Sequence, residues 1–175
     1  MKFEPCSVPD DLVARKPSGA SHYQDCYRAR VDSENVPEID QVARLFFAGA
    51  LPEWFVRLME LRNRVVGDPG FHPVEQLGEA NHRPFRVGDR IGHWTVSWRR
   101  KDEIIFFEST KGAEQAFSLR VRPTGSGFEA LVTTFVELRG WPKKLGYLPL
   151  RPLFRRIVLR HMDAVIAASL RGAAT

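Results

Sequence analysis

The sequence contains only two cysteines, Cys6 and Cys26, which form neither a CxxC motif nor a disulfide framework. Its five histidines lack HExxH and every other zinc-ligand spacing, and neither a GxSxG elbow nor a Ser–His–Asp pattern occurs. No apolar run approaches the roughly 18 residues of a membrane helix, and no targeting segment follows Met1. We therefore expect a protein of the reducing cytoplasm that needs no metal or other cofactor, with structural or incidental cysteines.

The sequence also has few clusters of residues with the same charge. The chain has 26 basic and 21 acidic residues, a formal net charge of +5, and its longest basic cluster is only Arg99–Lys101. Nucleic-acid binding needs a contiguous basic face with interleaved aromatic residues, so we expect no nucleic-acid partner. The length of 175 residues and the hydrophobic content of 43% fit a single globular domain, with residues 1–20 as an irregular lead-in.

The order of expected elements predicts an α+β fold. A first strand is expected over 22–31, two short helices over 37–49 and 52–67, and a loop over 68–89. The hydrophobic period then changes to two, which predicts strands within 90–98, 102–110, 115–123 and 127–138 that are joined by short turns. A long helix from about Pro152 ends the chain. Because an amphipathic helix buries its apolar side against a sheet, we expect a curved antiparallel sheet that grips this helix.

Three segments resemble the family called domain of unknown function 2867. They are YQDCYRARV (23–31), WFVRLMELRNRVVG (54–67) and VTTFVELRGWPKKLGYLPLRPLFRRIVLRHM (132–162). The element order is similar to that of the START-like helix-grip (SRPBCC) superfamily of lipid-transfer proteins and polyketide cyclases. This resemblance implies an apolar cavity between the sheet and the last helix that binds apolar or amphipathic molecules. The family often has a histidine where this chain has Arg155, so no role of that histidine carries over.

His161 interrupts the apolar stripe of the expected last helix. If this helix crosses the sheet, the imidazole enters the space between them, where it either binds a ligand or transfers protons near neutral pH. The structural alternative is a buried neutral imidazole that bonds to a carbonyl or to Thr134. The four tryptophans and the 12 phenylalanines fit a pocket or an ordinary core equally well; the tryptophans are Trp54, Trp94, Trp98 and Trp141. The expected walls of a ligand site are Trp94, Trp98, Phe106, Phe117, Val132 and Thr134.

A carboxylate accompanies these apolar candidates. Glu108 shares a strand face with Ile104 and Phe106, where it must find a partner or shift its pKa, unless the end of the strand is solvated. We expect Glu108 to contribute to the site. The favoured function is the binding of a small molecule without chemistry. The alternatives are a cyclase- or aromatase-like enzyme, in which His161 and Glu108 position protons, and a non-enzymatic module that docks on a partner.

Two expectations concern arginines outside this site. Arg120 alternates away from the apolar residues of its strand and is expected to face solvent. Four arginines are expected on the outer face of the last helix, where they predict at most a weak contact with an anionic membrane surface. They are Arg151, Arg155, Arg156 and Arg160.

Overall fold

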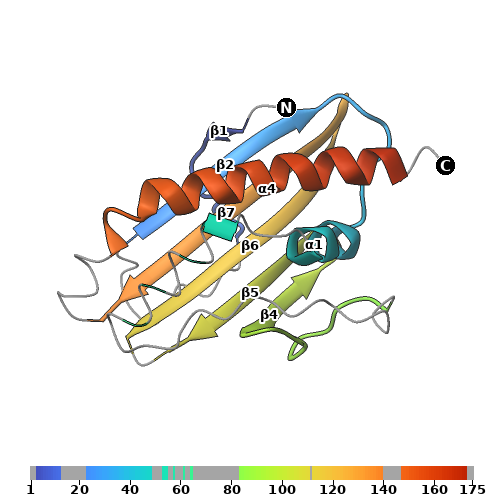
Figure 1. The fold of residues 1–175 in the computed structure, drawn as a ribbon. Coiled ribbons are helices and arrows are strands. Elements are labelled where there is room, and N and C mark those ends of the chain that lie inside the picture. Colours follow the sequence, from blue (N-terminus) through green and yellow to red (C-terminus); the bar gives the residue numbers. More distant parts are fainter. Residues whose placement is uncertain are drawn as a thin grey trace.

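A computed structural model describes residues 3–12, 23–48, 53–54, 57, 61, 64, 83–110, 112–139 and 147–172. These residues form an α+β fold in which seven strands make one antiparallel sheet of order β1-β2-β7-β6-β5-β4-β3 (Figure 1). Of the expected second helix over 52–67, Glu53, Trp54, Arg57, Leu61 and Arg64 are described and are helical. Its other residues and most of the expected loop over 68–89 lie outside the described residues.

The described elements confirm the first strand, the first helix, the four-stranded meander and the last helix. The helices with described bounds are α1 (Ile39–Ala48) and α4 (Arg151–Gly172). The strands are β1 (Glu4–Pro5), β2 (Tyr23–Val31), β3 (Arg90–Ile91), β4 (Trp94–Arg100), β5 (Glu103–Ser109), β6 (Ala113–Thr124) and β7 (Gly127–Leu138).

The larger part of the core lies on the face of the sheet that α1 and α4 cover (Figure 1). α4 has 22 residues and is therefore about 33 Å long, enough to lie across most of the sheet. Its Met162 and Ile166 are fully buried, as is Val42 of α1. The strands contribute alternate residues to this core, among them Ile104, Phe106, Leu119, Ala130 and Val132. The alternation expected for β5, β6 and β7 is confirmed.

The opposite face of the sheet, here called the back face, is covered by residues 3–12. Val8 and Leu12 pack against a smaller buried cluster of Ile105, Ala116 and Phe135. The chain reaches this face through β1, which pairs antiparallel with β2. The expectation of an irregular lead-in therefore misses an edge strand and the covering of a second apolar face.

Arg120 lies beneath this cover, and the expectation that it faces solvent is wrong. Its side chain is only 2% exposed. Its two terminal nitrogens donate to Asp11 at 2.9 and 2.6 Å, and its Nε donates to Asp102 at 3.2 Å. Arg120 does point away from the larger core, as the alternation of its strand predicts. What buries it is a segment more than 100 residues earlier in the sequence.

A β-bulge moves Trp98 to the back face. The register between β4 and β5 shifts between Val96 and Trp98, so that Val96 pairs with Phe106 and Trp98 pairs with Ile105. An extra residue in one strand reverses the faces of the residues that follow it. Trp98 consequently packs against the back-face cluster, with the Arg100 guanidinium 5.3 Å from its ring centroid. The prediction that Trp98 lines a site beside His161 is therefore wrong.

We expect Asp11→Asn to destabilise the fold at neutral pH and to destabilise it less in acid. Hydrogen bonds from Arg120 hold the pKa of the Asp11 carboxyl well below its usual range. A carboxyl with a lowered folded-state pKa stabilises the fold above its unfolded pKa of about 3.9, and this contribution disappears as the pH falls through the folded-state value. Urea unfolding of both proteins at about pH 6 and pH 3 measures the difference. A difference that stays constant or grows in acid would contradict the account.

Candidate functional site

α1 is anchored near its N-terminus by a buried carboxylate. Asp40 lies in the first turn, where a negative charge is favoured by the helix dipole. Its Oδ1 accepts a hydrogen bond from the Phe85 main-chain N–H at 2.7 Å, and its Oδ2 pairs with the Arg99 guanidinium of β4. These contacts join α1 to the segment before β3 and to the edge of the sheet.

His161 of α4 anchors the other end of α1. The last carbonyls of a helix have no partner within the helix, and the Phe46 carbonyl is one of them. Its oxygen lies 2.8 Å from His161 Nε2, and the two rings meet edge to face with centroids 5.2 Å apart. A carbonyl only accepts, so Nε2 carries the proton, and in the neutral ring Nδ1 keeps the lone pair. Burial lowers the pKa of His161 despite this bond, which favours the neutral form.

Aromatic rings fill the region between α1 and the sheet. Phe46 and Phe47 of α1 contact Phe117 and Phe106, with centroids 5.3 and 4.8 Å apart. Phe106 stacks on Phe117 at 5.0 Å, and Trp94 meets Phe117 edge to face at 4.8 Å. The expected walls Trp94, Phe106 and Phe117 are thus brought together, but as packed core.

Two other expected wall residues lie on the same face of β7. Val132 is buried in the larger core, and Thr134 is half-buried, paired across the strands with Phe117. The imidazole of His161 bonds to the Phe46 carbonyl rather than to Thr134. Of the structural partners considered for His161 from the sequence, the main-chain carbonyl is the one present.

Glu108 lies on the expected face of β5 but belongs to a different cluster. Its side chain is 9% exposed, and its Oε2 lies 3.5 Å from His93 Nε2. The His93 ring in turn lies beside Trp94, with centroids 5.4 Å apart. Glu108 and His161 are both described, and no hydrogen bond joins them. They do not form the directly bonded acid–base pair that the enzyme alternative would use most simply.

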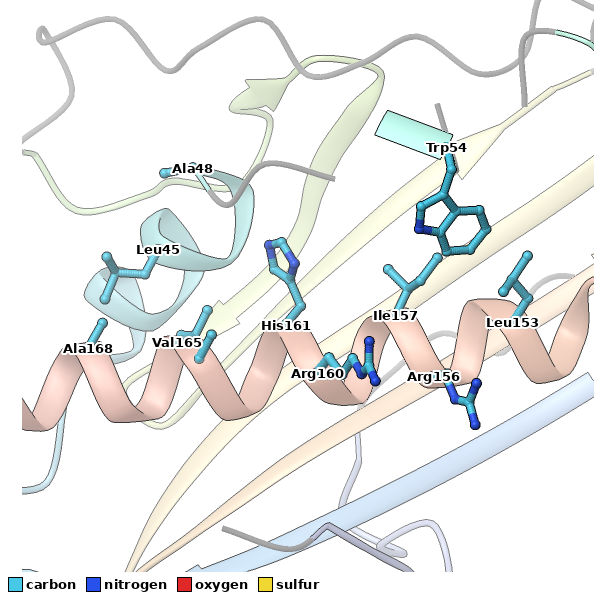
Figure 2. A pocket seen from close by; sticks show the side chains of 11 residues that line it. Leu45, Ala48, Trp54, Leu153, Arg156, Ile157, Arg160, His161, Val165 and Ala168 are labelled. Carbon is cyan, nitrogen blue, oxygen red and sulfur yellow. The ribbon is translucent and has the colours of Figure 1, made fainter. Parts of the chain in front are cut away.

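A hollow of about 510 Å³ lies between α1, Trp54 and α4 (Figure 2). This volume falls within the range of small-molecule sites, about 300–1,000 Å³. In Figure 2, Leu153, Ile157 and His161 point from α4 toward Trp54 and α1. Apart from two arginines and His161, the lining is apolar. It comprises Leu45, Ala48, Trp54, Leu153, Arg156, Ile157, Arg160, His161, Ala164, Val165 and Ala168.

Sequence reasoning placed His161 at a candidate site and counted Trp54 among the aromatic residues that fit a pocket or a core, but it missed the other residues of this hollow. The α4 residues repeat at helical spacing, as Leu153, Ile157, His161 and Ala168 illustrate, so their shared side was visible in the sequence. Leu45, Ala48 and Trp54 carry no such signal, because they approach this side only after α1 has packed on the sheet.

The four arginines of α4 do not form one basic outer face. Arg151 donates two hydrogen bonds to Asp25 of β2, at 3.1 and 2.7 Å. The Arg155 guanidinium lies 4.7 Å from the ring centroid of Tyr27, also in β2. Arg156 and Arg160 instead border the hollow, and both are exposed. Within the described part of the chain, neither of these two has an ion pair or hydrogen-bond partner for its side chain.

Two other kinds of feature are absent from the described residues. They contain no group of three or more histidine, cysteine, aspartate or glutamate side chains that could hold a metal ion. No helix among them is long and apolar enough to cross a membrane.

The chain belongs to the family described as "Protein of unknown function (DUF2867)", which matches residues 18–162. No curated protein matches it. Among solved structures it is similar to a Rhodobacter sphaeroides protein, with 13% identity, a TM-score of 0.40, and coverage of 95% of this chain and 99% of the other. It is also similar to CalU16 from Micromonospora echinospora, with 15% identity, a TM-score of 0.33 and 96% of each chain covered. These structural similarities are too distant to bear on function.

We expect His161→Phe to lower the free energy of unfolding by about 1–3 kcal/mol at pH 8, because the Phe46 carbonyl loses its donor. The deficit should shrink below pH 6.5. Below this pH, His161 takes up a proton in the unfolded wild-type protein, whereas its lowered pKa keeps it neutral in the folded protein. Protonation therefore favours the unfolded state of the wild type and lowers its free energy of unfolding. The variant has no imidazole at this position and is not affected in this way. Urea unfolding at about pH 8 and pH 5.5 measures both effects. Equal stability of the two proteins at pH 8 would show that the bond does not anchor α1.

Proposed function

We propose that this member of the DUF2867 family has a START-like helix-grip fold and binds an amphipathic small molecule in the hollow between α1, Trp54 and α4. The observation that carries the proposal is the composition of this hollow. Its walls are apolar, and its lining includes Arg156 and Arg160, of which Arg160 lies nearer to the apolar walls in Figure 2. A molecule with an apolar body and an anionic group matches both features.

The apolar walls favour the body of such a molecule. Trp54 is 52% exposed, and Leu153 and Ile157 are only partly buried beside it. Covering these side chains removes apolar surface from water, which stabilises the complex by about 25 cal/mol for each Å². A bound ligand would thus bury the apolar side chains that the packing of α1 and α4 leaves partly exposed.

The arginines favour an anionic group at the edge of the hollow. A guanidinium offers a planar fork of N–H donors that fits a carboxylate, sulfate or phosphate. Arg120 and Arg151 are committed to carboxylates, whereas the side chains of Arg156 and Arg160 pair with no carboxylate among the described residues. Arg160 lies along α4 between His161 and Ile157 in Figure 2, nearest to the apolar walls, whereas Arg156 extends from the other edge of the helix.

This site differs from the one expected from the sequence. Phe46, Phe47, Phe106 and Phe117 occupy the region between α1 and the sheet. The ligand site that we propose therefore lies between α1, Trp54 and α4. Binding is also favoured over proton transfer. The Nε2 of His161 is committed to the Phe46 carbonyl, and Glu108 is paired with His93.

Three molecules with the same alkyl chain and different head groups separate the contributions of the alkyl chain and of the charge to the binding affinity. Dodecanoate and dodecyltrimethylammonium, each below its micelle concentration, and dodecanol, below its solubility limit, are titrated into the protein while tryptophan fluorescence and heat are recorded. We expect saturable binding of dodecanoate at one site, weaker binding of dodecanol, and the weakest binding of the cation. Equal affinity for all three would contradict a role for the arginines, and no saturable binding of any would contradict the site.

Variants then locate the binding. Ala164 is exposed at the hollow, so Ala164→Trp fills the hollow without disturbing the core, and we expect a loss of dodecanoate affinity of about tenfold or more. The double variant Arg156→Gln, Arg160→Gln should lose about two- to thirtyfold for dodecanoate and little for dodecanol. Arg171→Gln is the matched control, because it removes a charge from the last turn of the same helix, outside the hollow. An equal loss in the control would assign the effect to net charge.

A further inference from the structure

The two cysteines, 20 residues apart in the sequence, meet on the back face of the sheet. Both are thiols, and their sulfur atoms are 2.9 Å apart. Their approach follows from the pairing of β1 with β2. Glu4 lies opposite Arg28 and Pro5 opposite Tyr27, so Cys6 falls opposite Cys26, and its N–H donates to the Cys26 carbonyl at 3.0 Å.

Residues that face each other in this way suit a covalent bond. In a hydrogen-bonded antiparallel pair the Cα atoms are about 5.5 Å apart, which is close to the commonest Cα separation of disulfides. From this juxtaposition we propose that Cys6 and Cys26 form a reversible disulfide that fastens residues 3–12 to β2. This modification is independent of the ligand site, which lies on the opposite face.

The surroundings of the two thiols give them different roles. Cys26 is buried and accepts a hydrogen bond from the Thr133 hydroxyl at 3.3 Å, whereas Cys6 is only half-buried. Cys6 is therefore the thiol that a soluble oxidant reaches first. Burial, together with the neighbouring Cys26 thiol, raises the pKa of Cys6 to about 12. Since the thiolate is the reactive form, exchange is slow at neutral pH and accelerates as the pH rises.

Glutathione disulfide serves as the oxidant in this scheme. The Cys6 thiol gives up its proton and attacks one sulfur of glutathione disulfide, which forms a mixed disulfide and releases one glutathione. Cys26 then gives up its proton and attacks the Cys6 sulfur. The bond between Cys6 and glutathione breaks as the Cys6–Cys26 bond forms, and the second glutathione leaves. Two protein thiols are oxidised, and one glutathione disulfide is reduced to two glutathione thiols.

The bond would act on the segment that covers the back face. Residues 3–12 carry Val8 and Leu12, which pack on the sheet, and Asp11, which pairs with the buried Arg120. A cross-link at Cys6 keeps this segment near the sheet even when its noncovalent contacts open, because it reduces the freedom of the detached state. The persistence of the contact between Asp11 and Arg120 therefore depends on the redox state of the two thiols.

The test equilibrates the protein at about pH 8.5 in buffers of decreasing glutathione-to-glutathione-disulfide ratio, starting both from folded protein and from protein refolded out of urea. Free thiols are then blocked with N-ethylmaleimide, and the intact mass is measured. We expect two blocked thiols in reducing buffer and, in oxidising buffer, a monomer that lacks two hydrogens and takes up no maleimide. Cys6→Ser and Cys26→Ser are the matched controls and cannot form this species.

A second readout reports on residues 3–12. In oxidising buffer we expect Asp11→Asn to lower the melting temperature less than in reducing buffer, and we expect this difference to vanish in a Cys6→Ser background. The proposal is overturned if both thiols remain blockable at every ratio from both starting states. It is equally overturned if the oxidised product is a glutathione adduct or a dimer joined between chains.

Discussion

The sheet has apolar residues on both faces, and each face must be covered for the chain to fold. α1 and α4 cover one face, where Phe106, Leu119 and Met162 are buried. Residues 3–12 cover the back face, and this cover encloses Arg120 with its carboxylate partners. An unpaired buried guanidinium would be costly, so the cover must carry Asp11 as well as apolar side chains. The pairing of β1 with β2 that delivers this cover also brings the two thiols into contact.

The same requirement determines where the candidate ligand site lies. The phenylalanines of α1 fill the region above Phe106 and Phe117, and His161 secures α1 by bonding to its last turn. Once this region is filled, the apolar side chains that stay partly exposed, such as Ile157, lie on the side of α4 that faces Trp54. The hollow is there, with Arg160 at its edge. A histidine that first resembles a catalytic group thus serves to hold two helices together beside the proposed ligand site.

The sequence predicted those features that depend on local pattern. Alternation assigned Phe106, Phe117 and Val132 to the face under the helices, because β5, β6 and β7 pair without a register shift. It failed at Trp98, where a bulge reverses the faces. It also failed in placing Arg120 in solvent, since a distant segment covers it. The contact of Cys6 with Cys26 and the position of the hollow depend on the packing of separate segments, for which no single stretch of sequence carries a signal.

The most direct test of the account is isotope-filtered NMR of labelled protein with unlabelled dodecanoate. It detects which protein protons lie next to the alkyl chain. We expect contacts from the alkyl chain to the side chains of Leu45, Ile157 and Ala168, and we expect the Arg160 guanidinium resonances to shift on binding. The proposed site would be contradicted by contacts confined to Val132 and Phe117 beneath the helices, or by contacts spread evenly over exposed apolar residues such as Val87 outside the hollow.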